Sequence, residues 1–126
     1  MNMSDSKTLT ASGIRYLIAI GELDNGTDGV RSKDIAAHIG VTKPSVSNMV
    51  AALQKMALVQ SERFGSVFLT DVGRALAREY TECYKLLYEK LTTVLGLSER
   101  DSNAATFSIL AQTPLSELPE LSERLH

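Results

Sequence analysis

Apolar residues recur at intervals of three and four in the first part of the chain, which predicts an amphipathic helix over residues 9–23. The pattern stops at DNGTDG, whose Asn-Gly and Asp-Gly pairs favour a turn. The Val30-Arg31 pair that follows is long enough for no more than a short strand. The apolar positions that define this first helix are Leu9, Ile14, Leu17, Ile18 and Ile20.

Two helices separated by a glycine turn are expected next. Ser32 is placed to cap a helix over residues 33–39, and Gly40 suits the left-handed conformation that ends one. Thr42 can cap a second helix through its hydroxyl, and Pro44 falls in the first turn, where a missing N–H is tolerated. The second helix is expected to run to about Met56, and the pair predicts a helix-turn-helix. Its apolar stripe consists of Val46, Met49, Val50 and Leu53.

The next segments alternate in polarity and predict a β-hairpin. Residues 59–63 and 67–69 are the two strands, and a hairpin directly after the second helix is typical of a wing, with Arg63 near its tip. Thr70 can cap a long helix that ends at Gly96, and Ser98 can open another that continues through Leu110. Pro114 and Pro119 limit the rest to a short tail. The stripe of the long helix is Val72, Leu76, Tyr80, Cys83, Leu87, Leu91 and Val94 or Leu95.

These elements predict a mainly α fold with two domains. Residues 1–70 form a winged helix-turn-helix of three helices and a two-stranded β wing, and residues 71–126 form a helical dimerisation domain. Residues 72–110 carry enough apolar surface to suggest a second chain, which predicts a homodimer. A two-fold dimer would set two recognition helices one or more DNA turns apart, which matches an inverted-repeat operator.

Composition narrows the class of protein. The 126 residues are 44% hydrophobic and can bury a core, yet the apolar runs are far shorter than the roughly 20 residues of a membrane-spanning helix. The N-terminus shows no export signal, so we expect a cytoplasmic protein. Cys83 is the single cysteine, which excludes an intrachain disulfide and a four-cysteine zinc site. We expect no enzyme, because no nucleophile–base pair or phosphate-binding glycine loop is present.

The polar face of the second helix is the candidate DNA-binding surface. Short side chains at its N-terminal end allow the close approach that the major groove requires, and Arg63 in the wing is placed to reach a phosphate or the minor groove. The net charge of −2 does not oppose this interpretation, because the acidic excess lies in the second half of the chain. The alternatives are that Thr42 and Ser45 only cap the helix, and that the fold binds protein instead of DNA. The face carries Thr42, Lys43, Ser45, Ser47 and Asn48.

Four stretches of the chain resemble the DtxR/MntR family of metal-dependent transcriptional repressors, over residues 9–125. The resemblance implies a winged-helix repressor that binds DNA as a homodimer, with Pro44 offering an apolar contact to a thymine methyl group. It also implies DNA contacts for Thr42, Ser45, Ser47 and Asn48. The stretches are Ile35-Ala36, GVTKPSVSNMVAALQKMALV, RFGSVFLTDVGRALA and VLGLS.

The family's metal site is not matched in this sequence. The resemblance implies Mn(II) or Fe(II), but the ligand positions hold Arg15, then Tyr84-Lys85, and then residues 104–110, which contain no Glu, Cys or His. Basic side chains repel a cation, so we predict no cofactor and DNA binding that is independent of metal. Glu79 and Cys83, four residues apart, are an alternative metal fragment, although the place of Cys83 in the apolar stripe favours a core residue.

The sequence therefore predicts a transcriptional regulator, most simply a repressor, that binds double-stranded DNA at specific sequences. The alternatives are a winged-helix module for protein interaction and a repressor with a non-standard metal site.

Overall fold

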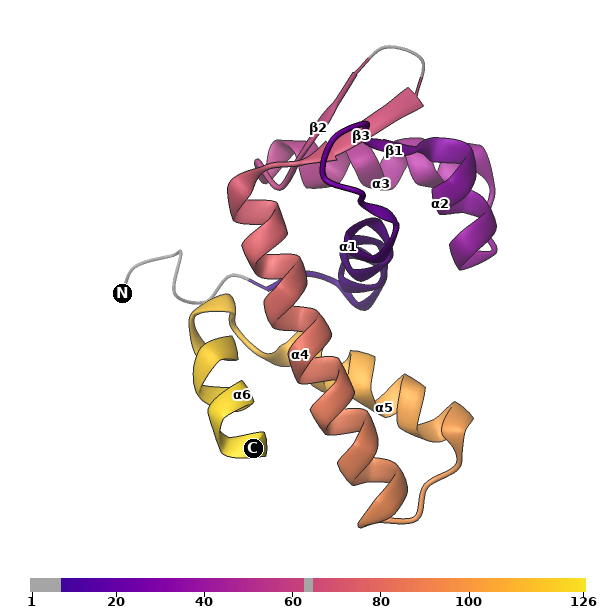
Figure 1. The fold of residues 1–126 in the computed structure, drawn as a ribbon. Helices are drawn as coiled ribbons and strands as arrows, with labels where there is room; N and C mark the ends of the chain where they lie inside the picture. Colours follow the sequence, from indigo (N-terminus) through magenta and orange to yellow (C-terminus); the bar gives the residue numbers. More distant parts are fainter. Residues whose placement is uncertain (1–7, 63–64) are drawn as a thin grey trace. The chain divides into compact units, whose positions relative to one another are not determined.

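The computed structural model describes residues 8–62 and 65–126. The chain divides into two compact units, residues 15–78 and residues 8–14 together with 79–126. The domain boundary at residue 70 stays a prediction. The elements in chain order (Figure 1) are α1 (Ala11–Leu23), β1 (Val30–Arg31), α2 (Ser32–Ile39), α3 (Lys43–Lys55), β2 (Val59–Ser61), β3 (Ser66–Leu69), α4 (Asp71–Thr93), α5 (Glu99–Gln112), η3 (Leu115–Glu117) and α6 (Leu118–Leu125).

The wing is part of a three-stranded antiparallel sheet with the order β1-β3-β2. The mainly α winged-helix class is confirmed, and the predicted wing is the hairpin of β2 and β3, to which β1 adds a third strand. Val30 pairs with Val67 on one side of β3, and Val59 pairs with Leu69 on the other. All four of these side chains are buried. The short first strand is therefore kept in the sheet by burial of Val30 and by backbone pairing, which no local pattern reveals.

Local capping accounts for the helix-turn-helix, with one exception. Gly40 adopts φ 83°, and its N–H donates to Ala36 O. Thr42 Oγ1 accepts from the Ser45 N–H at 3.3 Å, as predicted for an N-cap. Ser32 was expected to cap α2, but it is the first residue of that helix. Its hydroxyl donates instead to Gly65 O at 3.1 Å, so it links α2 to the wing.

A tight joint connects the end of α3, the sheet and the start of α4. Thr70 Oγ1 donates to Ala57 O at 2.8 Å and accepts from the Gly73 N–H at 3.0 Å, so it caps α4 as predicted. Gly73 is buried, and a Cβ there would overlap the carbonyl oxygen of Leu58. Ala57 adopts φ 61°, a left-handed conformation that disfavours a side chain. Only glycine at position 73 permits this approach.

The first turns of α4 are fixed to α1 within the same unit. Arg74 and Asp24 form an ion pair. A Cβ at Gly21 would lie 3.2 Å from the Cβ of Ala77, so the two helices pack closely there. Val72 was placed in the apolar stripe of the long helix, but it is 65% exposed, because the smaller Gly73 and Ala77 form the packed face.

In the other unit the second half of α4 contacts α5 through Tyr84 and α6 through Cys83 (Figure 1). Cys83 and Leu87 of the predicted stripe are buried, but α4 ends at Thr93, so Val94 and Leu95 lie beyond it and are 72% and 66% exposed. Ser98 caps α5 as predicted, since its hydroxyl accepts from the Asp101 N–H at 3.1 Å. Within the described ranges, no helix combines the length and the apolar character needed to cross a membrane.

Two polar groups of α4 are buried in this unit. Cys83 is fully buried, and its Sγ donates to Leu118 O at 3.6 Å. Burial raises the pKa of the Cys83 thiol to about 11, and the carboxylates of Glu79 and Glu82 contribute to the increase. Tyr80 is also fully buried, and burial raises the pKa of its phenol. Among the described residues, its hydroxyl has no hydrogen-bond partner.

We predict that Gly73→Ala lowers the free energy of unfolding by about 3 kcal/mol, because the new methyl group overlaps backbone that cannot move aside. Ala57→Gly in the same joint should raise it by about 1 kcal/mol, because glycine adopts a positive φ without strain. Urea denaturation followed by circular dichroism measures both. Equal stability of Gly73→Ala and wild type would contradict the close approach of Leu58 to position 73.

The raised pKa of Cys83 predicts a loss of stability in alkali. The folded state favours the neutral thiol, so its contribution is complete below the unfolded pKa near 9 and is lost as pH rises through the folded pKa of about 11. Thermal unfolding across this window should show a steeper decline for wild type than for Cys83→Ala, which lacks the titrating group. Parallel declines would contradict the assigned pKa.

Candidate nucleic-acid interface

Helix α3 exposes the residues that the sequence assigns to DNA. Its apolar side is fixed by the buried side chains of Val46, Val50 and Leu53. This burial leaves the opposite side of the helix to solvent. The exposed set, which we call the recognition face, is Thr42, Lys43, Pro44, Ser45, Ser47 and Asn48. The structure thus brings six of the seven predicted residues together in the cap and first two turns of one helix, and the seventh, Arg63, lies outside the described residues.

The N-terminal end of α3 has the electrostatic character of an anion site. Lys43 and Lys55 are the charged residues of the helix, which contains no carboxylate. The backbone N–H groups of a helix start point outward and give this end a partial positive charge. Thr42 and Ser45 present their hydroxyls beside these groups, with their oxygens 2.9 Å apart. The recognition face is therefore suited to phosphate oxygens and to the polar edges of bases.

The sheet adds a basic residue that sequence reasoning did not assign. Arg31 is exposed on β1, opposite Ser66 of the wing. It enters the winged-helix surface only because β1 pairs with β3. The signal available in the sequence was a basic residue in a two-residue apolar–polar strand, which is too short to be interpreted alone.

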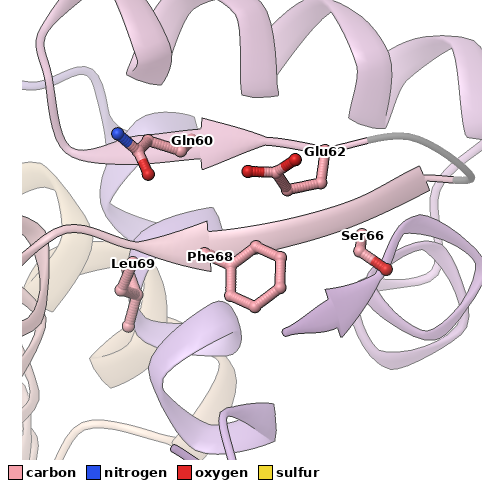
Figure 2. Close-up of a pocket in the computed structure, with 5 residues that line it drawn as sticks. All are labelled: Gln60, Glu62, Ser66, Phe68 and Leu69. Carbon is pink, nitrogen blue, oxygen red and sulfur yellow. The ribbon is translucent and has the colours of Figure 1, made fainter. Parts of the chain in front are cut away.

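The open face of the wing has a different chemistry. It contains an open hollow of about 690 Å³, lined by the residues that Figure 2 labels, Gln60, Glu62, Ser66, Phe68 and Leu69. Figure 2 shows Glu62, just after the end of β2, and Phe68 of β3 on this face. A carboxylate beside an aromatic ring disfavours a phosphate. The hollow is therefore not part of the candidate DNA surface.

The positions at which the family resemblance implies metal ligands hold side chains that do not fit a divalent ion. Arg15 and Lys85 are exposed basic residues. The Tyr84 hydroxyl donates to Asn103 Oδ1 at 2.6 Å, so it is engaged in a bond between helices. Divalent manganese and iron require carboxylate, imidazole or thiolate ligands. Among the described residues, no group of three such side chains is placed to hold an ion.

In the alternative metal fragment, Glu79 and Cys83, the cysteine has the surroundings of a core residue. A metal-ligating cysteine must be a thiolate, and burial raises the pKa of the Cys83 thiol to about 11, so a metal would have to displace a tightly held proton there. Its Sγ is engaged with Leu118 O. Glu82 contacts the imidazole of His126 at 3.1 Å. Glu79 and Cys83 therefore gain no support as ligands from this geometry.

Sequence comparison identifies relatives of the winged-helix unit. Residues 8–66 match the profile of the iron dependent repressor, N-terminal DNA binding domain. Transcriptional regulator MntR of Escherichia coli O6:H1 is 35% identical over 83 residues, which are 66% of this chain and 53% of that protein. MntR of Salmonella typhimurium is 34% identical over 83 residues, 66% of this chain and 52% of that protein. The chain thus spans about half the length of these curated relatives.

Solved structures share the fold. The manganese regulator SloR superposes with a TM-score of 0.71 at 24% identity, over 90% of this chain and 53% of that chain. The hypothetical protein SSo2273 from Sulfolobus solfataricus superposes with a TM-score of 0.64 at 19% identity, over 93% of this chain and 89% of that chain. The profile match and the MntR relatives, together with a helix-turn-helix and wing of the expected form, identify residues 8–66 as a winged-helix DNA-binding domain of the DtxR/MntR family.

Proposed function

We propose that this protein is a sequence-specific transcription regulator, a repressor, that binds an inverted repeat in double-stranded DNA as a homodimer and without a divalent ion. The observation that carries the proposal is the recognition face, which is polar, free of carboxylates and located at a helix N-terminus. Family membership supports the same function.

Each residue of the recognition face has a role suited to its chemistry. Lys43 and the hydroxyls of Thr42 and Ser45 would contact phosphates, which position the helix but carry little sequence information. Pro44 would contact a thymine methyl group. Ser47 and Asn48 lie further along α3 and would reach base edges, where an amide can pair with both N6 and N7 of adenine. Specificity is thus expected to depend on Asn48 more than on Lys43.

An exposed apolar patch in the helical unit is the candidate dimer surface. Val94 and Leu95 are more than half exposed, and Leu97 and Ile109 are 36% and 39% exposed. Val94, Leu95 and Leu97 make up the patch in the segment that joins α4 to α5, and Ile109 lies apart from them in the sequence, near the end of α5. Large apolar side chains gathered in one segment are more typical of an interface than of a free surface. We assign this patch to a second copy of the chain.

Selection from a pool of random duplexes tests DNA binding. We expect wild type to enrich an inverted repeat, and Asn48→Ala to weaken binding to that repeat about 10- to 100-fold, the loss typical of one bidentate base contact. Lys43→Ala should weaken binding to specific and random DNA alike and reduce its dependence on salt. Lys55→Ala is the matched control, since it removes the exposed lysine at the other end of α3 and should change affinity little.

Three outcomes would contradict parts of the proposal. No enriched sequence with wild type would favour the protein-interaction module. Enrichment that disappears in EDTA would favour a repressor with a non-standard metal site. If Lys55→Ala weakened DNA binding as much as Asn48→Ala, the DNA contacts would lie at the C-terminal end of α3, contrary to the proposal.

Light scattering tests the dimer. We expect wild type to have the mass of a dimer at micromolar concentration, and Leu95→Glu to have that of a monomer, because a buried unpaired carboxylate is strongly unfavourable at an apolar interface. Gln112→Glu adds the same charge at an exposed polar position of α5 and should remain dimeric. A monomeric wild type, or a dimeric Leu95→Glu, would remove this patch as the interface.

A further inference from the structure

Helices α4 and α5 are joined by a cluster centred on Tyr84. The Tyr84 hydroxyl donates to Asn103 Oδ1 at 2.6 Å, across the turn that separates the two helices. Its ring stacks on Tyr88 of the same helix, with centroids 5.7 Å apart, and lies against Phe107 of α5 at 5.1 Å. One residue of α4 thus makes both a polar and an aromatic contact with α5. We call Tyr84, Tyr88, Asn103 and Phe107 the tyrosine cluster.

The tyrosine cluster lies where the family resemblance expects metal ligands in the helical unit, at Tyr84 and along residues 104–110. Its groups are a phenol, one carboxamide and aromatic rings, so it offers a single carbonyl oxygen and none of the carboxylates, imidazoles or thiolates with which proteins hold Mn(II) or Fe(II). The Asn103 oxygen already accepts the Tyr84 hydroxyl proton. The side chains of the tyrosine cluster therefore do not fit a binding site for a divalent ion.

The same geometry gives the cluster a positioning role. An ion ligated by two helices fixes one against the other, and a cross-helix hydrogen bond with aromatic contacts has the same effect without a ligand. Asn103 and Phe107 are one turn apart on α5, and Tyr84 contacts both. Next to them on α5, Ser102 and Thr106 are fully buried, with the Thr106 hydroxyl bonded to Ser102 O at 2.7 Å. This side of α5 is therefore closely packed.

We propose that the tyrosine cluster takes the structural place of a metal ion and holds α5 against α4 without an effector. Tyr84 is the positioning residue, and Asn103 is its partner. This inference deepens the proposal of metal-independent DNA binding and rests on it for its biological meaning. Its tests use no DNA, so the two proposals can fail separately.

The first test compares two tyrosines one turn apart on α4. Tyr84→Phe removes the hydrogen bond to Asn103 and should lower Tm by about 3 to 6 °C, as loss of one such bond does in a domain of this size. Tyr80→Phe removes a buried hydroxyl that has no partner among the described residues, so Tm should stay equal or rise. In wild type, Tm should be the same in EDTA and in millimolar MnCl₂. A lower Tm in EDTA, or equal Tm values for the two tyrosine variants, would overturn the proposal.

The second test converts the cluster into a metal site. If positions 84, 103 and 107 converge, the triple variant Tyr84→His, Asn103→His and Phe107→His presents three imidazoles that can bind Zn²⁺. Its Tm should rise by several degrees on adding ZnCl₂ and fall again with EDTA, whereas wild type should not respond. The variant with Tyr84 retained and the two α5 histidines introduced is the control and should respond less. A triple variant that gains no more from zinc than this control would overturn the placement of the cluster.

Discussion

The contact between Gly73 and the carbonyl oxygen of Leu58 determines how the winged-helix unit is assembled. It places the first turn of α4 against the segment that leaves α3 and enters β2. Thr70 reinforces the joint, because its hydroxyl donates to Ala57 O and accepts from the Gly73 N–H. The same few residues therefore fix the end of the recognition helix, the strands of the wing and the start of the long helix. A larger residue at position 73 would separate all three.

The recognition face depends on this scaffold for its position but on local chemistry for its character. Burial of Val46, Val50 and Leu53 determines which side of α3 meets solvent. The Thr42 hydroxyl accepts a hydrogen bond from one backbone N–H of the first turn, that of Ser45. The other N–H groups of this turn stay available to a ligand. Because α3 has no carboxylate, nothing on the helix opposes the approach of a phosphate. Capping and DNA contact are thus compatible roles of the same residues.

In the proposed arrangement of the helical unit, a cross-link made by side chains takes the place of one made by an ion. Tyr84 connects α4 to α5 through a hydrogen bond and ring contacts, at positions where the family resemblance expects an ion. An ion is a cross-link that depends on its concentration, whereas a tyrosine–asparagine pair is always present. In the proposed function, such a unit would leave DNA binding to be controlled by protein concentration or by another ligand.

The sequence by itself determined the features that arise within one turn of a helix. The caps Thr42 and Ser98, the ending at Gly40 and the polar face of α3 follow from side chains three or four residues apart, because such interactions need no distant partner. Six residues of the candidate site could be predicted from the sequence in this way. Only the tertiary structure decided the pairing of β1 with β3, the bond from Ser32 to Gly65 and the contact of Tyr84 with Asn103. These join residues 19 to 37 positions apart, and which of them meet depends on packing of the whole unit rather than on any local pattern.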